Sequence, residues 1–112
     1  LGDGGGVETI LWQRPVTYAV YPASSISVML EAWARSFGGT ATFNLRLGGT
    51  SRTPTDGAII ASVTLPFSVD PNYAPVSMAA TISKLSGQDY LKLTCIAGSG
   101  DARIAEGGVT LT

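Results

Sequence analysis

The chain has 112 residues, seven of them basic and eight acidic, with a net charge of −1, one cysteine and no histidine. This length suits a single domain, and the charge balance provides no basic stripe for phosphates, so we expect no nucleic-acid partner. Apolar runs of at most four residues are far shorter than the ~20 residues of a membrane-spanning helix, so we expect no membrane partner either.

The N-terminal residues 1–6 read Leu-Gly-Asp-Gly-Gly-Gly, which leaves few side chains to pack. We predict a flexible arm over residues 1–6 and one β-sandwich domain over residues 7–112. Alternating residues then predict strands at Val7–Gln13 and Val16–Tyr21. Because Pro15 and Pro22 flank the second strand and proline cannot donate to a sheet ladder, this strand should lie at an edge or a bend, and the two elements could be one kinked strand.

The next segment matches two periodicities. Helical spacing fits Ile26, Met29, Leu30, Trp33 and Phe37. We predict instead a strand over Ser25–Ser36, because its other set of alternating residues matches the parity of the strand Thr40–Leu47 across a turn at Phe37-Gly38. In that hairpin Glu31 would lie near Asn44 and diagonally from Arg46.

Four further strands are predicted at Ala58–Leu65, Val76–Ser83, Tyr90–Ala97 and Ala102–Thr112, with the last one broken at Gly107-Gly108. Their inward faces should carry Ile59, Ala61, Val63 and Leu65, then Val76, Met78, Ala80 and Ile82, then Leu91, Leu93 and Cys95. The polar connection 48–57 should lie on the surface, and the proline-rich connection 66–75 should cross between two sheets. About eight short strands of this kind predict an all-β antiparallel β-sandwich.

The residue types argue against catalysis. Without histidine there is no Ser-His or Cys-His arrangement and no common zinc ligand. Two carboxylates can hydrolyse a glycoside, and Glu31 with Glu106 is the best candidate pair, but no spacing forces them together. The acidic turn residues form no dense calcium loop. We therefore predict no catalytic residue, no metal site and no cofactor.

Binding residues are sought among the aromatic residues, several of which have outward parity on their strands, and among the large side chains beside them. The candidates for an interface or a ligand site are Trp33, Met29, Trp12 and Tyr73. An exposed aromatic ring can stack on a sugar or anchor a protein interface, whereas a register slip of one residue would place Trp33 in the core. The sequence leaves these three roles for Trp33 open.

Three stretches resemble the small jelly-roll domains of tailed-phage virion proteins, of the tail fibre, tailspike or capsid accessory type. They are Ser27-Val28-Met29-Leu30-Glu31-Ala32-Trp33-Ala34-Arg35, Gly39-Thr40-Ala41-Thr42-Phe43-Asn44-Leu45-Arg46-Leu47-Gly48-Gly49-Thr50 and Asp56-Gly57-Ala58. The resemblance implies a jelly-roll-like sandwich in a virion or extracellular particle, assembled in the host cytoplasm. It also implies a structural or adhesive role as a homo-oligomer, commonly a trimer, beside other virion proteins.

Two functions follow as hypotheses. The first is a non-enzymatic structural or interaction module of a virion or similar assembly, because only 13% of the residues are charged and such a surface suits coverage by a partner. The alternative is a carbohydrate-binding module that uses exposed aromatic residues, since jelly-roll domains also serve as lectins.

Overall fold

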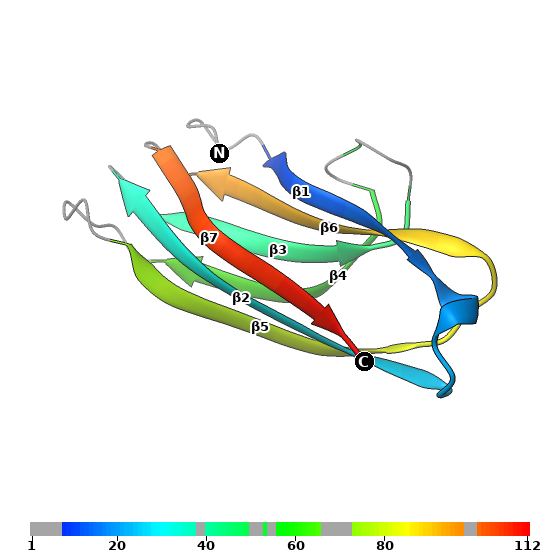
Figure 1. The fold of residues 1–112 in the computed structure, drawn as a ribbon. Helices are drawn as coiled ribbons and strands as arrows, with labels where there is room; N and C mark the ends of the chain where they lie inside the picture. Colours follow the sequence, from blue (N-terminus) through cyan, green and yellow to red (C-terminus); the bar gives the residue numbers. More distant parts are fainter. Residues whose placement is uncertain (1–7, 38–39, 50–52, 54–55, 66–72, 98–100) are drawn as a thin grey trace.

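The computed structural model describes residues 8–37, 40–49, 53, 56–65, 73–97 and 101–112, without the side chains of residues 36–37, 97, 101–103 and 105–106. This part of the chain is built almost entirely from strands (Figure 1). The strands are β1 (Glu8–Thr17), β2 (Ser25–Phe37), β3 (Ala41–Leu47), β4 (Ala58–Leu65), β5 (Ala74–Ser83), β6 (Gln88–Ala97) and β7 (Asp101–Leu111). A single 3₁₀ turn, Tyr18–Val20, follows β1, and no helix in the described residues is long and apolar enough to cross a membrane.

The strands form two antiparallel sheets. Sheet A has the order β1-β6-β3-β4 and sheet B the order β5-β2-β7. In Figure 1 the strands β7 and β2 of sheet B pass in front of β3 and β4 of sheet A. The predicted all-β antiparallel sandwich is thus confirmed, with seven strands where about eight were expected.

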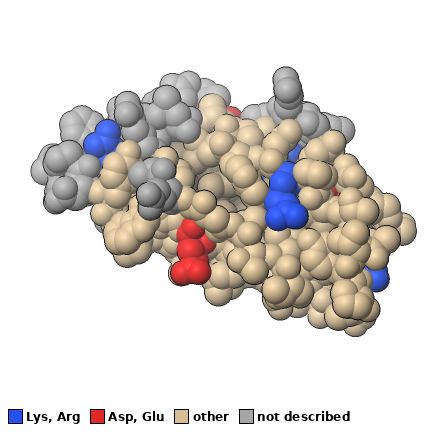
Figure 2. Space-filling model, viewed as in Figure 1, with Lys and Arg blue, Asp and Glu red and all other residues tan. Residues whose placement is uncertain are grey.

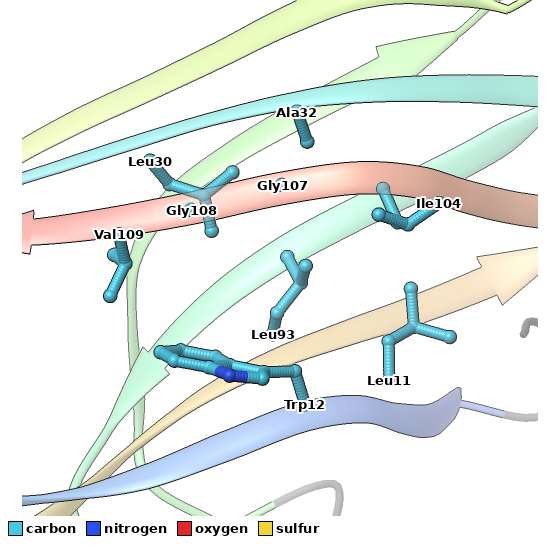
Figure 3. A pocket seen from close by; sticks show the side chains of 9 residues that line it. All are labelled: Leu11, Trp12, Leu30, Ala32, Leu93, Ile104, Gly107, Gly108 and Val109. Carbon is cyan, nitrogen blue, oxygen red and sulfur yellow. The ribbon is translucent and has the colours of Figure 1, made fainter.

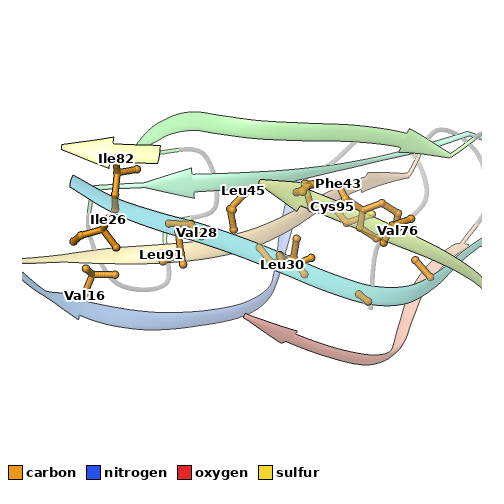
Figure 4. Packing of buried hydrophobic residues seen from close by; sticks show 14 of the residues in the cluster. Val16, Ile26, Val28, Leu30, Phe43, Leu45, Val76, Ile82, Leu91 and Cys95 are labelled. Atoms are coloured by element: carbon orange, nitrogen blue, oxygen red, sulfur yellow. The ribbon is translucent and has the colours of Figure 1, made fainter. Parts of the chain in front are cut away.

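The core fills the space between the sheets, and each strand contributes the alternate residues that point inward. Figure 4 shows Phe43, Leu45 and Cys95 of sheet A beside Val28 and Leu30 of sheet B. All five are at most 3% exposed, and full burial of a side chain the size of Phe43 stabilises the fold by about 1.5–3 kcal/mol. The thiol of Cys95 is buried, which confirms its predicted inward position.

The first two predicted strands form one strand in the structure. The prediction of a separate strand Val16–Tyr21 is therefore wrong, and the alternative prediction of one kinked strand is confirmed. β1 continues through Pro15 to Thr17, and a bulge at Leu11 interrupts its register with β6. Pro15 is tolerated because β1 lies at the edge of sheet A, where no neighbouring strand needs its missing N–H.

The predicted hairpin between the second and third β-strands is wrong. β2 pairs with β5 and β7, whereas β3 pairs with β4 and β6 in the other sheet. Glu31 therefore lies opposite Ser77 and Gly108, far from the neighbours that the hairpin would have provided. The inward parity was correct in both strands, but matching parity fits two strands that face each other across a core as well as two that pair side by side.

Two strand details also differ from the prediction. Ile59 was expected inside but is 50% exposed, because a bulge at Ile60 shifts the parity of β4 against β3. The last strand is not broken at Gly107-Gly108: β7 pairs with β2 through both glycines. An added Cβ at Gly107 would lie only 3.2 Å from the Cβ of Ala32, so glycine here permits close approach of the two strands.

The connection between β4 and β5 passes from sheet A to sheet B, as predicted for residues 66–75, although residues 66–72 and the predicted arm 1–6 lie outside the described residues.

Candidate binding surface

Two of the four candidate residues, Met29 and Trp33, lie on the outer face of β2, the central strand of sheet B. Their side chains are 43% and 47% exposed, whereas Leu30 and Ala32 between them are buried on the inner face. This alternation is that of a strand with one wet face. We define the Trp33 face as the outward residues of sheet B around this ring: Met29, Glu31, Trp33, Pro75, Ser77 and Gly108.

A hollow of about 620 Å³ opens beside Trp33. It is lined by residues of all three strands of sheet B: Glu31, Ala32, Trp33, Pro75, Val76, Ser77 and Gly107. The volume lies within the range of about 300–1,000 Å³ that is typical of small-molecule sites. The Trp33 face therefore combines an exposed indole ring with space for a ligand.

Two polar side chains accompany the indole ring in the hollow. Glu31 and Ser77 are both exposed and lie opposite each other on β2 and β5. On the other side of Glu31 lies Gly108 of β7, where an added Cβ would meet no atom within 4 Å. The carboxylate can only accept hydrogen bonds, whereas the hydroxyl of Ser77 can donate or accept. A ligand with several hydroxyl groups matches this set.

Tyr73, another candidate, immediately precedes β5 and is half-buried. The guanidinium carbon of Arg35 lies 5.2 Å from the centroid of its ring, which is within cation–π range. Arg35 follows Trp33 by two positions on β2 and so has the same outward parity. This pair bounds the Trp33 face at one end but does not line the hollow.

Charge is sparse on this side of the molecule. Figure 2 shows the view in which β2 and β7 lie in front, and most of its described surface is uncharged, with only a few charged side chains. Such a surface suits stacking and hydrogen bonding better than ion pairing.

Trp12, the fourth candidate, lies in the other sheet and apart from the Trp33 face. It is half-buried on β1 and lines an apolar groove of about 240 Å³ between the edge strands β1 and β7. Figure 3 shows Leu11 and Trp12 extending from β1 toward Ile104 and Val109 of β7. The groove is smaller than most ligand sites, and its walls offer few polar groups.

The outer face of sheet A carries a polar network that the sequence reasoning missed. Arg46 of β3 holds the carboxylate of Glu8 on β1 through two hydrogen bonds, of 2.8 and 2.9 Å, and Thr94 of β6 also donates to this carboxylate. These contacts, led by the hydrogen bond from Arg46, lower the pKa of Glu8 below its ordinary value although burial opposes the shift.

The same face buries a lysine. The Lys92 side chain is fully buried and its Nζ donates to the carbonyl of Thr53 at 2.8 Å and to the carboxylate of Asp56. Both acceptors belong to the β3–β4 connection, which therefore covers this part of sheet A. In the sequence, Lys92 and Thr94 alternate with the inward residues of β6. This parity alone predicts that both side chains lie on a solvent-exposed face of the sheet. The charged side chains of these two ion pairs on sheet A thus contact one another within the fold. The Glu31 and Ser77 side chains of the Trp33 face, in contrast, are exposed.

The backbone of Glu106 lies opposite Trp33 and Glu31 lies opposite Gly108, so the two residues of the carboxylate pair considered for catalysis occupy diagonal positions on neighbouring strands. The Glu106 side chain is outside the description, so the geometry of this pair is not tested. Within the described residues, no group of three or more His, Cys, Asp or Glu side chains could hold a metal ion.

No protein-family model and no curated protein matches the sequence. Among solved structures, the chain is similar to one described as "EclA C-terminal domain; sugar-binding protein", with a TM-score of 0.56 and 15% identity over 94% of this chain and 69% of that one. The structure of infectious bursal disease virus Gx strain is a weaker match, with a TM-score of 0.41 and 16% identity over 96% of this chain and 27% of that one. At 15% identity the first likeness supports the sandwich fold alone, and the second is too weak to support a conclusion about this chain.

Proposed function

We propose that this chain is a non-enzymatic carbohydrate-binding module whose ligand site is the hollow beside Trp33. The observation that carries the proposal is the half-exposed indole ring of Trp33 lining one hollow with the Glu31 carboxylate and the Ser77 hydroxyl. Sugar rings present an apolar C–H face and a rim of hydroxyl groups. The indole would stack on that apolar face, and the two polar side chains would pair with the hydroxyl rim.

Two further observations agree with this function. The hollow has the size of a small-molecule site, and β2 lies at the centre of its sheet, so the ring is held by strands on both sides. The solved structure with the similar fold is described as a sugar-binding protein, which supports the proposal only through the shared architecture.

The test is glycan-array binding of the wild-type chain, followed by titration of the best ligand against Trp33→Ala and Met29→Ala. Met29 is the matched control, because it is similarly exposed on the same strand but does not line the hollow. Trp33→Ala should lower the affinity by about 5- to 150-fold, since stacking on an aromatic side chain contributes ~1–3 kcal/mol. Met29→Ala should leave it unchanged. No binding across a broad glycan set would overturn the proposal.

A protein-assembly module is the second candidate, and the specific observation that favours it is the pair of large apolar side chains exposed on the outer face of sheet B, Met29 and Trp33. In this role the face packs against a second copy, as in a trimer, or against another virion protein. Both alanine variants should then weaken assembly while the monomer stays folded. Light scattering coupled to size exclusion decides between the candidates: a closed oligomer lost in both variants favours assembly, and a monomer at all concentrations excludes self-assembly.

A further inference from the structure

The geometry points to a ligand class for the Trp33 face: neutral or amino-bearing sugars with two adjacent free hydroxyls, and not sugars that carry a carboxylate. This inference rests on the proposed function and concerns which sugars the hollow selects. Its basis is the position of Glu31 within the hollow, the groups that flank this residue and the charge that it brings.

Glu31 is the one charged residue among the described residues that line the hollow. It lies two positions from Trp33 on the same strand face, so a sugar ring stacked on the indole would bring its rim toward the carboxylate. A carboxylate has two acceptor oxygens and no donor. It therefore pairs best with two adjacent hydroxyls, each of which donates one hydrogen bond, or with an ammonium group.

Access to the carboxylate is open on the β7 side. Gly108 lies opposite Glu31 and has no side chain, and an added Cβ there would point into open space. On the β5 side, Ser77 lies opposite and can complete the hydrogen bonds of a third hydroxyl. A sugar can thus approach Glu31 across β7 while its ring rests on Trp33.

An acidic sugar in the same position would bring a second negative charge close to Glu31. The positively charged group nearest along β2, Arg35, lies beyond Trp33 against the Tyr73 ring and does not line the hollow. Like charges at contact distance, partly screened by water, weaken binding by about five- to tenfold relative to the neutral sugar.

The experiment compares three ligands that share one ring and differ in charge: glucose, glucosamine and glucuronate, with the galactose and mannose series in parallel. Binding is followed by NMR through the indole N–H signal of Trp33, assigned with Trp33→Ala, and affinities are compared within each series. In the series that binds, we expect the amino sugar and the neutral sugar to bind about five- to tenfold more tightly than the uronate at low salt.

Two variants separate charge from access. Glu31→Gln should bring the uronate to within about twofold of the neutral sugar, because the repulsion is gone while the size of the side chain is kept. Gly108→Val should weaken all three ligands alike by covering the approach to residue 31, and it should leave the chain folded, since its Cβ meets no atom within 4 Å.

The outcomes are distinguishable. If the wild-type chain binds the uronate as tightly as the neutral sugar, or if Glu31→Gln leaves a preference against uronate intact, the inference about ligand class is wrong while carbohydrate binding stands. If no sugar in any series shifts the NMR signal of Trp33, and no glycan on the array binds the wild-type chain, the proposed function itself fails.

Discussion

Lys92 and Asp56 form an ion pair in which only one partner is fully buried, and this asymmetry predicts unequal effects of removing either charge. The Lys92 side chain is 0% exposed and that of Asp56 is 34% exposed. Asp56→Asn keeps the shape of the acceptor but leaves a buried ammonium without its counter-charge. Lys92→Met keeps the apolar stem and leaves a carboxylate that water can reach.

The magnitudes follow from burial. Breaking a buried ion pair so that a charge remains uncompensated costs about 3–5 kcal/mol, and we expect Asp56→Asn to reduce the free energy of unfolding by about 3 kcal/mol. Lys92→Met forfeits hydrogen bonds to Asp56 and to the carbonyl of Thr53, whose acceptors rehydrate, so we expect a loss of about 1–2 kcal/mol.

Urea unfolding monitored by tryptophan fluorescence measures both variants. With a slope of about 1–3 kcal/mol per molar urea, the midpoint of Asp56→Asn should lie about 0.3–2 M below that of Lys92→Met. The double variant should resemble Lys92→Met, because removal of the ammonium removes the need for its counter-charge. If Lys92→Met is the more destabilised of the two single variants, the lysine is hydrated in solution and the β3–β4 connection does not cover it.

Three further predictions concern stability. The pKa of Glu8 is lowered chiefly by Arg46, so its stabilising contribution is present above the ordinary value of 4.5 and is lost as the pH falls through the lowered pKa. Urea midpoints measured between about pH 7 and pH 3 should therefore fall more steeply for the wild type than for Glu8→Gln, and parallel profiles would contradict this. The Tyr18 hydroxyl donates to Asp89 at 2.6 Å, and burial together with this carboxylate raises its pKa from 10.0 to about 12. Its contribution is complete below pH 10 and is lost between about pH 10 and 12, so Tyr18→Phe should lack that alkaline decline; if thermal melts show the same decline in both proteins, the assignment is wrong. Phe43 is 0% exposed, and Phe43→Ala should cost about 3–5 kcal/mol in the same urea assay, whereas a cost below about 1 kcal/mol would mean that the core collapses around the missing ring.

The binding candidates show how far residue parity reaches. Met29 and Trp33 were predicted to point outward because they alternate with Leu30 and Ala32, and both are exposed. The hollow beside Trp33 could not be predicted in this way. It depends on Pro75 and Ser77 of β5 and on Gly107 of β7, which meet β2 only through long-range pairing.

Local sequence by itself determined the all-β class, the approximate strand positions and the inward faces, because the alternation of side chains along a strand depends on neighbouring residues alone. Tertiary structure decided which strands pair, since the inward residues of β2 and β3 have the same parity whether these strands share a sheet or face each other across the core. It also decided the exposure of Lys92, an outward residue that becomes buried only when a distant connection folds over it. The candidate site on sheet B has the same origin: its residues come from three strands that are far apart in the chain, and only their pairing brings the indole, the carboxylate and the hydroxyl into one hollow.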